Sequence, residues 1–202
     1  MDNLPLKALS CPNMPGRNYT RLFELAEHCY GYFTAEQARD VGVQPRRLAE
    51  MAERGTIRRV GYGVYRIEQF PVHELDTYAE ATLWPRGVPG VLSHETALDL
   101  YGLSDVNPAK IHLTVPKTHR IRRLSPQLYA IHHEDLAGGA VTRHEGLPIV
   151  TAAKAVRQCA AEHLRRDLLA QAVEEGRRTG LIGRAEHDVL VSELGLARVE
   201  AP

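Results

Sequence analysis

The sequence predicts an α+β fold, in which an N-terminal helical unit ending in a β-hairpin precedes a mixed α/β domain with a small sheet and flanking helices. Three observations lead to this prediction. Between residues 20 and 55, apolar side chains recur at helical spacing in short segments that glycines separate. Two β-rich runs then flank residues 61–63, and from residue 75 onward helical segments alternate with short strands.

Bulk composition excludes several classes of protein. The 202 residues are 44% hydrophobic and 25% charged, as in a globular chain of one domain or two small ones, which excludes a disordered protein. The 25 basic and 25 acidic residues cancel, which excludes a protein that coats nucleic acid by bulk charge. No segment approaches the ~20 apolar residues of a membrane span and no signal peptide is recognisable, so we expect a cytoplasmic protein with no membrane partner.

Proline and glycine divide the chain into three parts. We expect residues 1–18, which hold three prolines, to form a flexible leader, residues 19–70 a first domain and residues 71–202 a second. The first domain should begin with a short amphipathic helix that starts at about residue 20 and ends at Gly31. The apolar face of this helix comprises Leu22, Leu25, Ala26 and Cys29.

Two further helices are expected to follow, joined by a tight turn. Thr34 and the glutamine three residues later have the spacing of a capping box, which predicts a helix over residues 35–41. Gly42 ends this helix, because a left-handed backbone favours glycine. The next helix has Pro45 in its first turn, turns its arginines outward and ends at Gly55.

The neutral overall charge hides a local surplus of arginine. Residues 1–66 carry ten Lys/Arg and seven Asp/Glu, a net charge of +3, whereas residues 67–149 carry −3 and residues 150–202 carry zero. Between residues 44 and 66 the surplus is higher still, with six arginines against two glutamates. Neutrality therefore does not exclude a small basic surface on this part of the chain.

The element order predicts a winged helix–turn–helix, with the hairpin over residues 57–66 as the wing. Such a unit binds double-stranded DNA with the start of its second helix in the major groove and its wing on phosphates or in the minor groove. A surface that only docks another protein is the alternative, because arginines also line solvated faces. The residues expected to contact DNA are Thr34, Gln44, Arg46, Arg47, Arg54, Arg58, Arg59 and Tyr62.

Three runs of this region resemble the N-terminal domain of AbiEi-type bacterial antitoxins. They are YFTAEQA (32–38), GVQPRRL (42–48) and GTIRRVGYGVYR (55–66). LSHETAL (92–98) and RHEGLP (143–148) extend the resemblance over roughly residues 20–165. The resemblance implies the antitoxin of a type IV toxin–antitoxin pair, which binds operator DNA and represses its own operon. It also implies a nucleotidyltransferase-like toxin that the protein counteracts, with no stable complex required.

The second domain should contain helices and short strands in alternation. Helices are expected over residues 75–84, from Ser93 to Gly102 and from Thr151 onward, and strands over 111–115, 128–132 and 141–143. The last segment should form helices whose apolar pairs are core residues, with breaks between them. The apolar pairs are Leu168/Leu169, Ala172/Val173 and Val189/Leu190, and the expected breaks are Gly176, Gly180 and Gly183.

A second basic cluster follows the strand at 111–115. It comprises Lys117, His119, Arg120, Arg122 and Arg123. A solvated loop is one interpretation, and an additional contact with DNA phosphates or with the toxin is the other, because two basic patches on one chain can clamp bent DNA.

No catalytic, metal or cofactor site is expected. Nucleophile-elbow, phosphate-loop and kinase signatures are missing from the sequence. His132 and His133 should point to opposite faces of a strand, and His94 and His144 have no second ligand at metal-site spacing, so we interpret these histidines as isolated. The cysteines, at 11, 29 and 159, are too widely spaced for a disulfide framework or zinc module.

Two other interpretations remain open. The first is a winged-helix regulator that binds a small ligand, and its affinity for the operator would change when that ligand binds. An enzyme that modifies the toxin by phosphoryl transfer would increase the mass of its partner in the presence of a nucleotide. A nucleotidyltransferase-like gene immediately downstream would favour the antitoxin instead.

Overall fold

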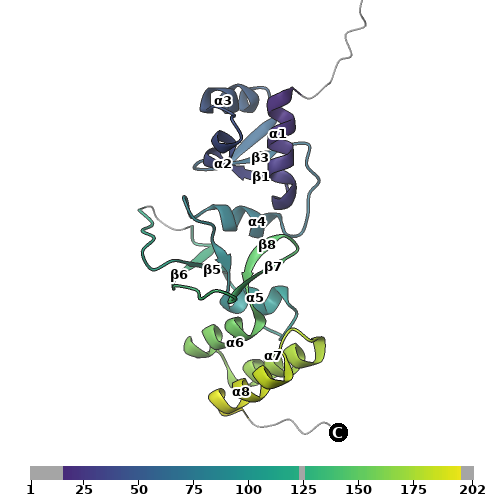
Figure 1. Ribbon diagram of the computed structural model, residues 1–202, viewed down its shortest axis with the longest axis vertical. Helices are drawn as coiled ribbons and strands as arrows, with labels where there is room; N and C mark the ends of the chain where they lie inside the picture. Colours follow the sequence, from purple (N-terminus) through teal and green to yellow (C-terminus); the bar gives the residue numbers. More distant parts are fainter. Residues whose placement is uncertain (1–15, 123–125, 197–202) are drawn as a thin grey trace, which may run out of the picture.

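The computed structural model of the protein describes residues 16–122 and 126–196. Along the longest axis, a unit of helices around a small sheet is followed by a second sheet and then by a group of helices (Figure 1). The first unit contains α1 (Arg17–Ala26), a 3₁₀ turn (Glu27–Cys29), β1 (Tyr32–Thr34), α2 (Ala35–Asp40), α3 (Pro45–Glu53), β2 (Ile57–Gly61) and β3 (Val64–Ile67).

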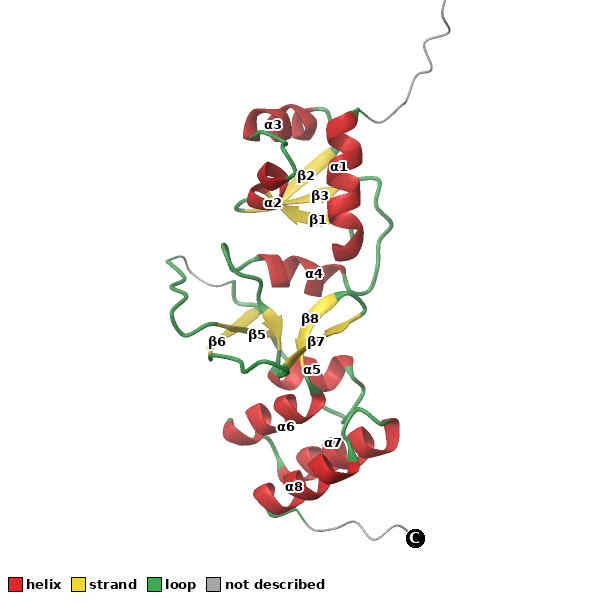
Figure 2. Cartoon of the chain, viewed as in Figure 1, coloured by secondary structure: helices red, strands yellow, loops and turns green. Residues whose placement is uncertain are grey.

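The rest of the chain is a mixed α/β arrangement, which confirms the predicted α+β class (Figure 2). Its helices are α4 (Asp76–Leu83), α5 (His94–Leu100), α6 (Ala152–Ala161), α7 (Arg166–Thr179) and α8 (Arg184–Leu194). Its strands are β4 (Val91–Leu92), β5 (Ile111–Val115), β6 (Tyr129–His133), β7 (Val141–His144) and β8 (Leu147–Val150). They form one sheet in the order β6-β5-β4-β8-β7.

The first helix starts earlier than expected. The backbone N–H groups of Tyr19 and Thr20 donate to the carbonyl of Gly16, so α1 begins at Arg17 rather than at residue 20. Its last residues tighten into the 3₁₀ turn, and the chain then reverses at Gly31 with a left-handed backbone, φ +85°. Most of the expected leader, residues 1–15, lies outside the described residues.

The helix–turn–helix is confirmed in detail. The Thr34 hydroxyl accepts from the Gln37 N–H at 3.1 Å, and the Gln37 side chain accepts from the Thr34 N–H at 2.8 Å, which completes the capping box of α2. Gly42 adopts φ +82° in the turn, and Pro45 is the first residue of α3. Gln44 has the extended backbone of a cap residue, but its side chain makes no capping hydrogen bond.

The wing is also confirmed, and it belongs to a three-stranded sheet. β2 and β3 pair antiparallel around the two-residue turn Tyr62-Gly63, where Gly63 has φ +76°. β3 is the central strand, because β1 pairs with its other edge. β1 was not predicted, since three residues are too few to show a period.

Buried side chains join the N-terminal unit to the second sheet. The core of the N-terminal unit includes Leu22, Phe33 and Leu48. Tyr32 and Val64 of the small sheet instead belong to the larger core, which α4 continues, since α4 contacts β1, β5 and β8. The helix α4 thus fixes the second sheet against the winged unit.

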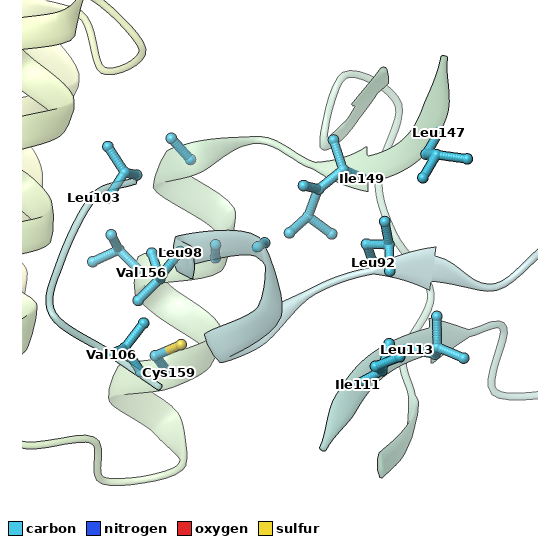
Figure 3. Packing of buried hydrophobic residues seen from close by; sticks show 14 of the residues in the cluster. Leu92, Leu98, Leu103, Val106, Ile111, Leu113, Leu147, Ile149, Val156 and Cys159 are labelled. Atoms are coloured by element: carbon cyan, nitrogen blue, oxygen red, sulfur yellow. The ribbon is translucent and has the colours of Figure 1, made fainter. Parts of the chain in front are cut away.

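The larger core continues between the second sheet and the last helices. Figure 3 shows Leu98 of α5 near Val156 and Cys159 of α6, with Leu103 and Val106 beside them. Burial raises the pKa of the Cys159 thiol well above its usual range, as expected for a packing residue. Burial also raises the pKa of Cys29, to about 11, and Cys11 lies outside the described residues.

Gly176 was expected to break a helix, and this prediction was wrong. Gly176 lies inside α7 and is buried, and a Cβ atom there would lie 2.5 Å from Cδ1 of Ile182. The helix needs glycine at this position because the chain after Gly180 folds back against it. Of the expected core pairs, Leu169, Ala172 and Val173 are buried, as is Leu190, whereas Val189 is exposed. None of the helices in the described part of the chain has the length and apolar character needed to cross a membrane.

Gly31 provides a test of the packing beneath the wing. A Cβ atom at Gly31 would lie 2.6 Å from Cβ of Phe70. We expect Gly31→Ala to lower the free energy of unfolding by about 2–4 kcal/mol in urea titrations, since left-handed strain and overpacking add. Gly55→Ala is the control, because Gly55 is also left-handed at φ +69° but has no described atom within 4 Å. Equal losses in the two variants would contradict a role for the Phe70 contact.

Candidate nucleic-acid interface

The start of α3 presents charged side chains to solvent. Leu48 and Met51 anchor the helix in the core, so the face that carries Arg46 points outward, and the Arg46 side chain is 92% exposed. Gln44, just before the helix, is exposed as well. The first turn of α3 is therefore exposed, at the position where a helix–turn–helix meets the edges of DNA bases.

Arg46 and Arg47 differ in exposure and in how tightly other side chains hold them. Both contact Glu50, at 3.3 Å from Arg46 Nε to Oε1 and at 2.8 Å from Arg47 Nη1 to Oε2. The hydrogen bond from Arg47 is the main cause that holds the pKa of Glu50 below its usual range. Arg47 is only 39% exposed, and its Nε is buried without a hydrogen-bond partner among the described residues. Arg46 is thus the better candidate for a base contact.

The wing carries an exposed aromatic side chain at its tip. Tyr62 is 60% exposed, and the guanidinium of Arg59 lies 5.6 Å from its ring centroid. Arg58 on the same strand is 58% exposed and pairs with Glu68 at 2.6 Å. These side chains can reach phosphates beside the groove that α3 would enter.

The structure brings the second basic cluster next to the wing. Tyr62, Arg86, Arg120 and Arg122 line one pocket of about 430 Å³, and we call these four residues the wing-tip patch. The Arg86 guanidinium lies 4.7 Å from the Tyr62 ring centroid, and the three arginines are exposed. In the view of Figure 1, the loop between β5 and β6 extends to the same side as α2 and α3, with α1 on the other side.

The wing-tip patch differs from the sequence prediction at its edges. Arg86 was missed, because it follows Pro85 in a loop where no periodicity or charge run marks it. Lys117 is exposed but does not line the pocket, and its backbone N–H donates to Asp135 Oδ1 at 3.0 Å. Arg123 lies outside the described residues.

Thr34 and Arg66, two further residues of the basic region, have structural roles. The Thr34 hydroxyl is engaged in the capping box, although it lies near the wing, where Gly63 accepts from the Ala35 N–H. Arg54 is exposed at the end of α3. Arg66 was counted in the basic surplus, but it is 5% exposed and pairs with Asp76 at 3.0 Å. The basic surface therefore excludes Arg66.

The interpretation of the histidines as isolated was wrong, because the fold brings three of them together. His94 at the start of α5, His112 on β5 and His132 on β6 each place one ring nitrogen within 4.8 Å of the others. Burial is the main cause that lowers the pKa of all three imidazoles, that of His94 to about 3. His94 and His112 lie 18 residues apart in the chain, and His112 and His132 lie 20 apart, so the sequence shows no metal-site spacing.

Comparisons with known proteins bear on the first unit. Residues 21–67 match the family model described as a transcriptional regulator, AbiEi antitoxin, which confirms the resemblance over the winged helix–turn–helix. No curated protein matches the chain. Among solved structures, the crystal structure of the RV2827C protein from Mycobacterium tuberculosis is similar at 12% identity and a TM-score of 0.48, over 89% of this chain and 72% of that chain.

Proposed function

We propose that this protein is the antitoxin of a bacterial toxin–antitoxin pair, which binds operator DNA through its winged helix and represses its own operon. In this proposal, α3 enters the major groove and the wing-tip patch follows the phosphates. The protein acts by binding, not by catalysis, and it counteracts a nucleotidyltransferase-like toxin. The family match at residues 21–67 supports the regulatory half of this function.

One observation carries the DNA-binding proposal: basic side chains from separate parts of the chain lie together beside the wing. Arg86, Arg120 and Arg122 come from two loops of the second domain, yet they line one pocket with Tyr62. Their clustering favours an anionic partner, because repulsion among exposed arginines needs a function to offset it. A DNA backbone passing the wing would meet all four residues.

The test is titration of the full chain with DNA from upstream of its own gene, measured by fluorescence anisotropy at physiological salt. We expect specific binding on the order of 10⁻⁸ M if two half-sites cooperate, and weaker binding to a scrambled sequence. Equal affinity for operator and scrambled DNA would contradict the proposal and favour a surface that docks a protein.

A single substitution on α3 tests which side chain reads the bases. We expect Arg46→Ala to reduce discrimination at one base pair of the operator by about 1–3 kcal/mol, because an arginine that contacts a guanine edge is worth that much. The fold should be unaffected, since the Arg46 side chain is 92% exposed. The measurement is anisotropy against operators with single base changes.

Arg54→Ala is the matched control for Arg46→Ala. Arg54 is also exposed but lies at the other end of α3, where phosphates rather than base edges are expected. Its loss should weaken binding to all operators alike. An unchanged base preference in Arg46→Ala would refute the proposed orientation of α3.

A further inference from the structure

The histidine cluster lies where the second sheet meets α5 and α6. β5 and β6 pair in parallel, with His112 opposite Ala130 and Thr114 opposite His132, so His112 and His132 share one face of the sheet. His94 follows β4, and its ring stacks on that of His132 with centroids 3.6 Å apart. Three strands and a helix start thus bring three imidazoles to one point.

A carboxylate borders the three imidazoles. Glu162, directly after α6, places Oε1 at 3.0 Å from Nδ1 of His132 and at 3.8 Å from Nε2 of His94. The other nitrogen of His132, Nε2, lies 3.0 Å from Nδ1 of His112. An imidazole gives only one nitrogen to an ion, so His132 would share an ion with His112 through Nε2, while Glu162 holds Nδ1. Imidazole nitrogens are ligands that divalent zinc prefers.

Outer side chains hold the first of these histidines in position. Nδ1 of His94 lies 3.0 Å from the Ser93 hydroxyl, which also accepts from Thr114 at 2.8 Å. Gln158 Oε1 accepts from the His94 backbone N–H at 3.3 Å. Metal-binding histidines usually engage their second ring nitrogen in this way, which leaves the first free for the ion.

His94 also has a strained backbone. Its φ of +53° lies in the left-handed region, which a residue with a side chain rarely adopts because it is strained there. His94 is 6% exposed, so solvent contact does not explain the residue type at this position. Strain of this kind persists where the position of a side chain matters, and here it directs a buried imidazole toward His132 and Glu162.

We propose that His94, His112 and His132 bind a divalent cation of the zinc type, with the Glu162 carboxylate holding the other ring nitrogen of His132. In a tetrahedral site with bonds of about 2.0–2.1 Å, ligand atoms lie about 3.4 Å apart. The ring nitrogens already lie within 4.8 Å of one another, so the widest pair must close by no more than about 1.4 Å.

The three histidines can be reached from solvent. Glu162 is 49% exposed and His132 18% exposed, so an ion can enter from the Glu162 side. Bound there, the ion links α5 to β5 and β6.

The experiment uses the full chain, freed of any histidine tag and dialysed against a chelator. Zinc chloride is titrated by calorimetry, and cobalt(II) is added in parallel so that its visible absorption reports the coordination geometry. We expect one ion per chain, a tetrahedral cobalt spectrum and a higher melting temperature with zinc than with chelator. No binding by the natural chain, or several weak sites without a tetrahedral spectrum, would overturn the proposal.

Three variants locate the site. His132→Ala is expected to weaken zinc binding by more than about a hundredfold, beyond the loss that follows removal of an outer partner. Glu162→Gln, at a position that is 49% exposed, should weaken it by about tenfold or more. His133→Ala is the matched control, because His133 is the exposed neighbour on the opposite face of β6. Equal losses in His132→Ala and His133→Ala would overturn the proposal, even if His132→Ala were less stable.

Discussion

Replacing Arg66 with alanine is expected to lower the free energy of unfolding by about 3–5 kcal/mol, because it leaves a buried carboxylate without its partner. The side chains of Arg66 and Asp76 are 6% and 16% exposed, and they pair at 3.0 Å. Oδ1 of Asp76 is already buried without a hydrogen-bond partner among the described residues. Removal of the guanidinium would leave this carboxylate almost unpaired.

Arg66 also fixes the segment that joins the two parts of the chain. Its Nη2 donates to the carbonyls of Phe70 at 3.2 Å and Pro71 at 3.0 Å, and its guanidinium lies 5.4 Å from the Tyr32 ring centroid. The loss should therefore appear as a lower urea midpoint, measured by circular dichroism, and not as a selective loss of DNA affinity.

Arg58→Ala is the control for Arg66→Ala. Arg58 faces Arg66 across the β2–β3 pair, but it is 58% exposed and its pair with Glu68 lies at the surface. Such a pair contributes about 0–1 kcal/mol. Removing both buried charges, in Arg66→Met with Asp76→Leu, should cost less than Arg66→Ala alone. A loss of stability below 1 kcal/mol in Arg66→Ala would show that the pair does not hold the linker.

The role of Arg66 marks a limit of what the sequence predicts. Local sequence patterns predict α2, α3 and the wing. The capping box at Thr34 and the glycines at 42 and 63 fix the backbone through contacts within a few residues. The β-rich pattern of residues 58–66 does not show that residues 68–75 fold back over Arg66. Burial of that arginine depends on a contact ten residues away, with Asp76.

The same limit applies to other parts of the fold. β1 and β4 have three and two residues and exist through their partners, β3 for one and β5 and β8 for the other. Gly176 has the local character of a helix break, yet packing against Ile182 keeps it inside α7. In the wing-tip patch, the sequence singled out Tyr62, Arg120 and Arg122 but not Arg86, since only the fold brings Arg86 to Tyr62.

Removal of the three arginines of the wing-tip patch is expected to have the largest effect on DNA binding. In the triple variant Arg86→Ala, Arg120→Ala and Arg122→Ala, three phosphate contacts are lost if the patch follows the DNA backbone. Each contact contributes about 0.9 to the slope of log affinity against log salt, so the slope should fall by about 2.7. At 0.15 M salt the operator affinity should fall roughly a hundredfold, with base preference unchanged.

The measurement is anisotropy with operator DNA over a range of salt concentrations, together with an assay of toxin neutralisation in cells. Arg165→Ala, Arg177→Ala and Arg178→Ala together form the control, because these arginines are exposed in or beside α7, at the far end of the molecule from the wing (Figure 1). An unchanged slope in the wing-tip variant with loss of neutralisation would assign the patch to the toxin. A reduced slope with neutralisation intact would assign the wing-tip patch to DNA, because the salt dependence of DNA affinity comes from the phosphate contacts.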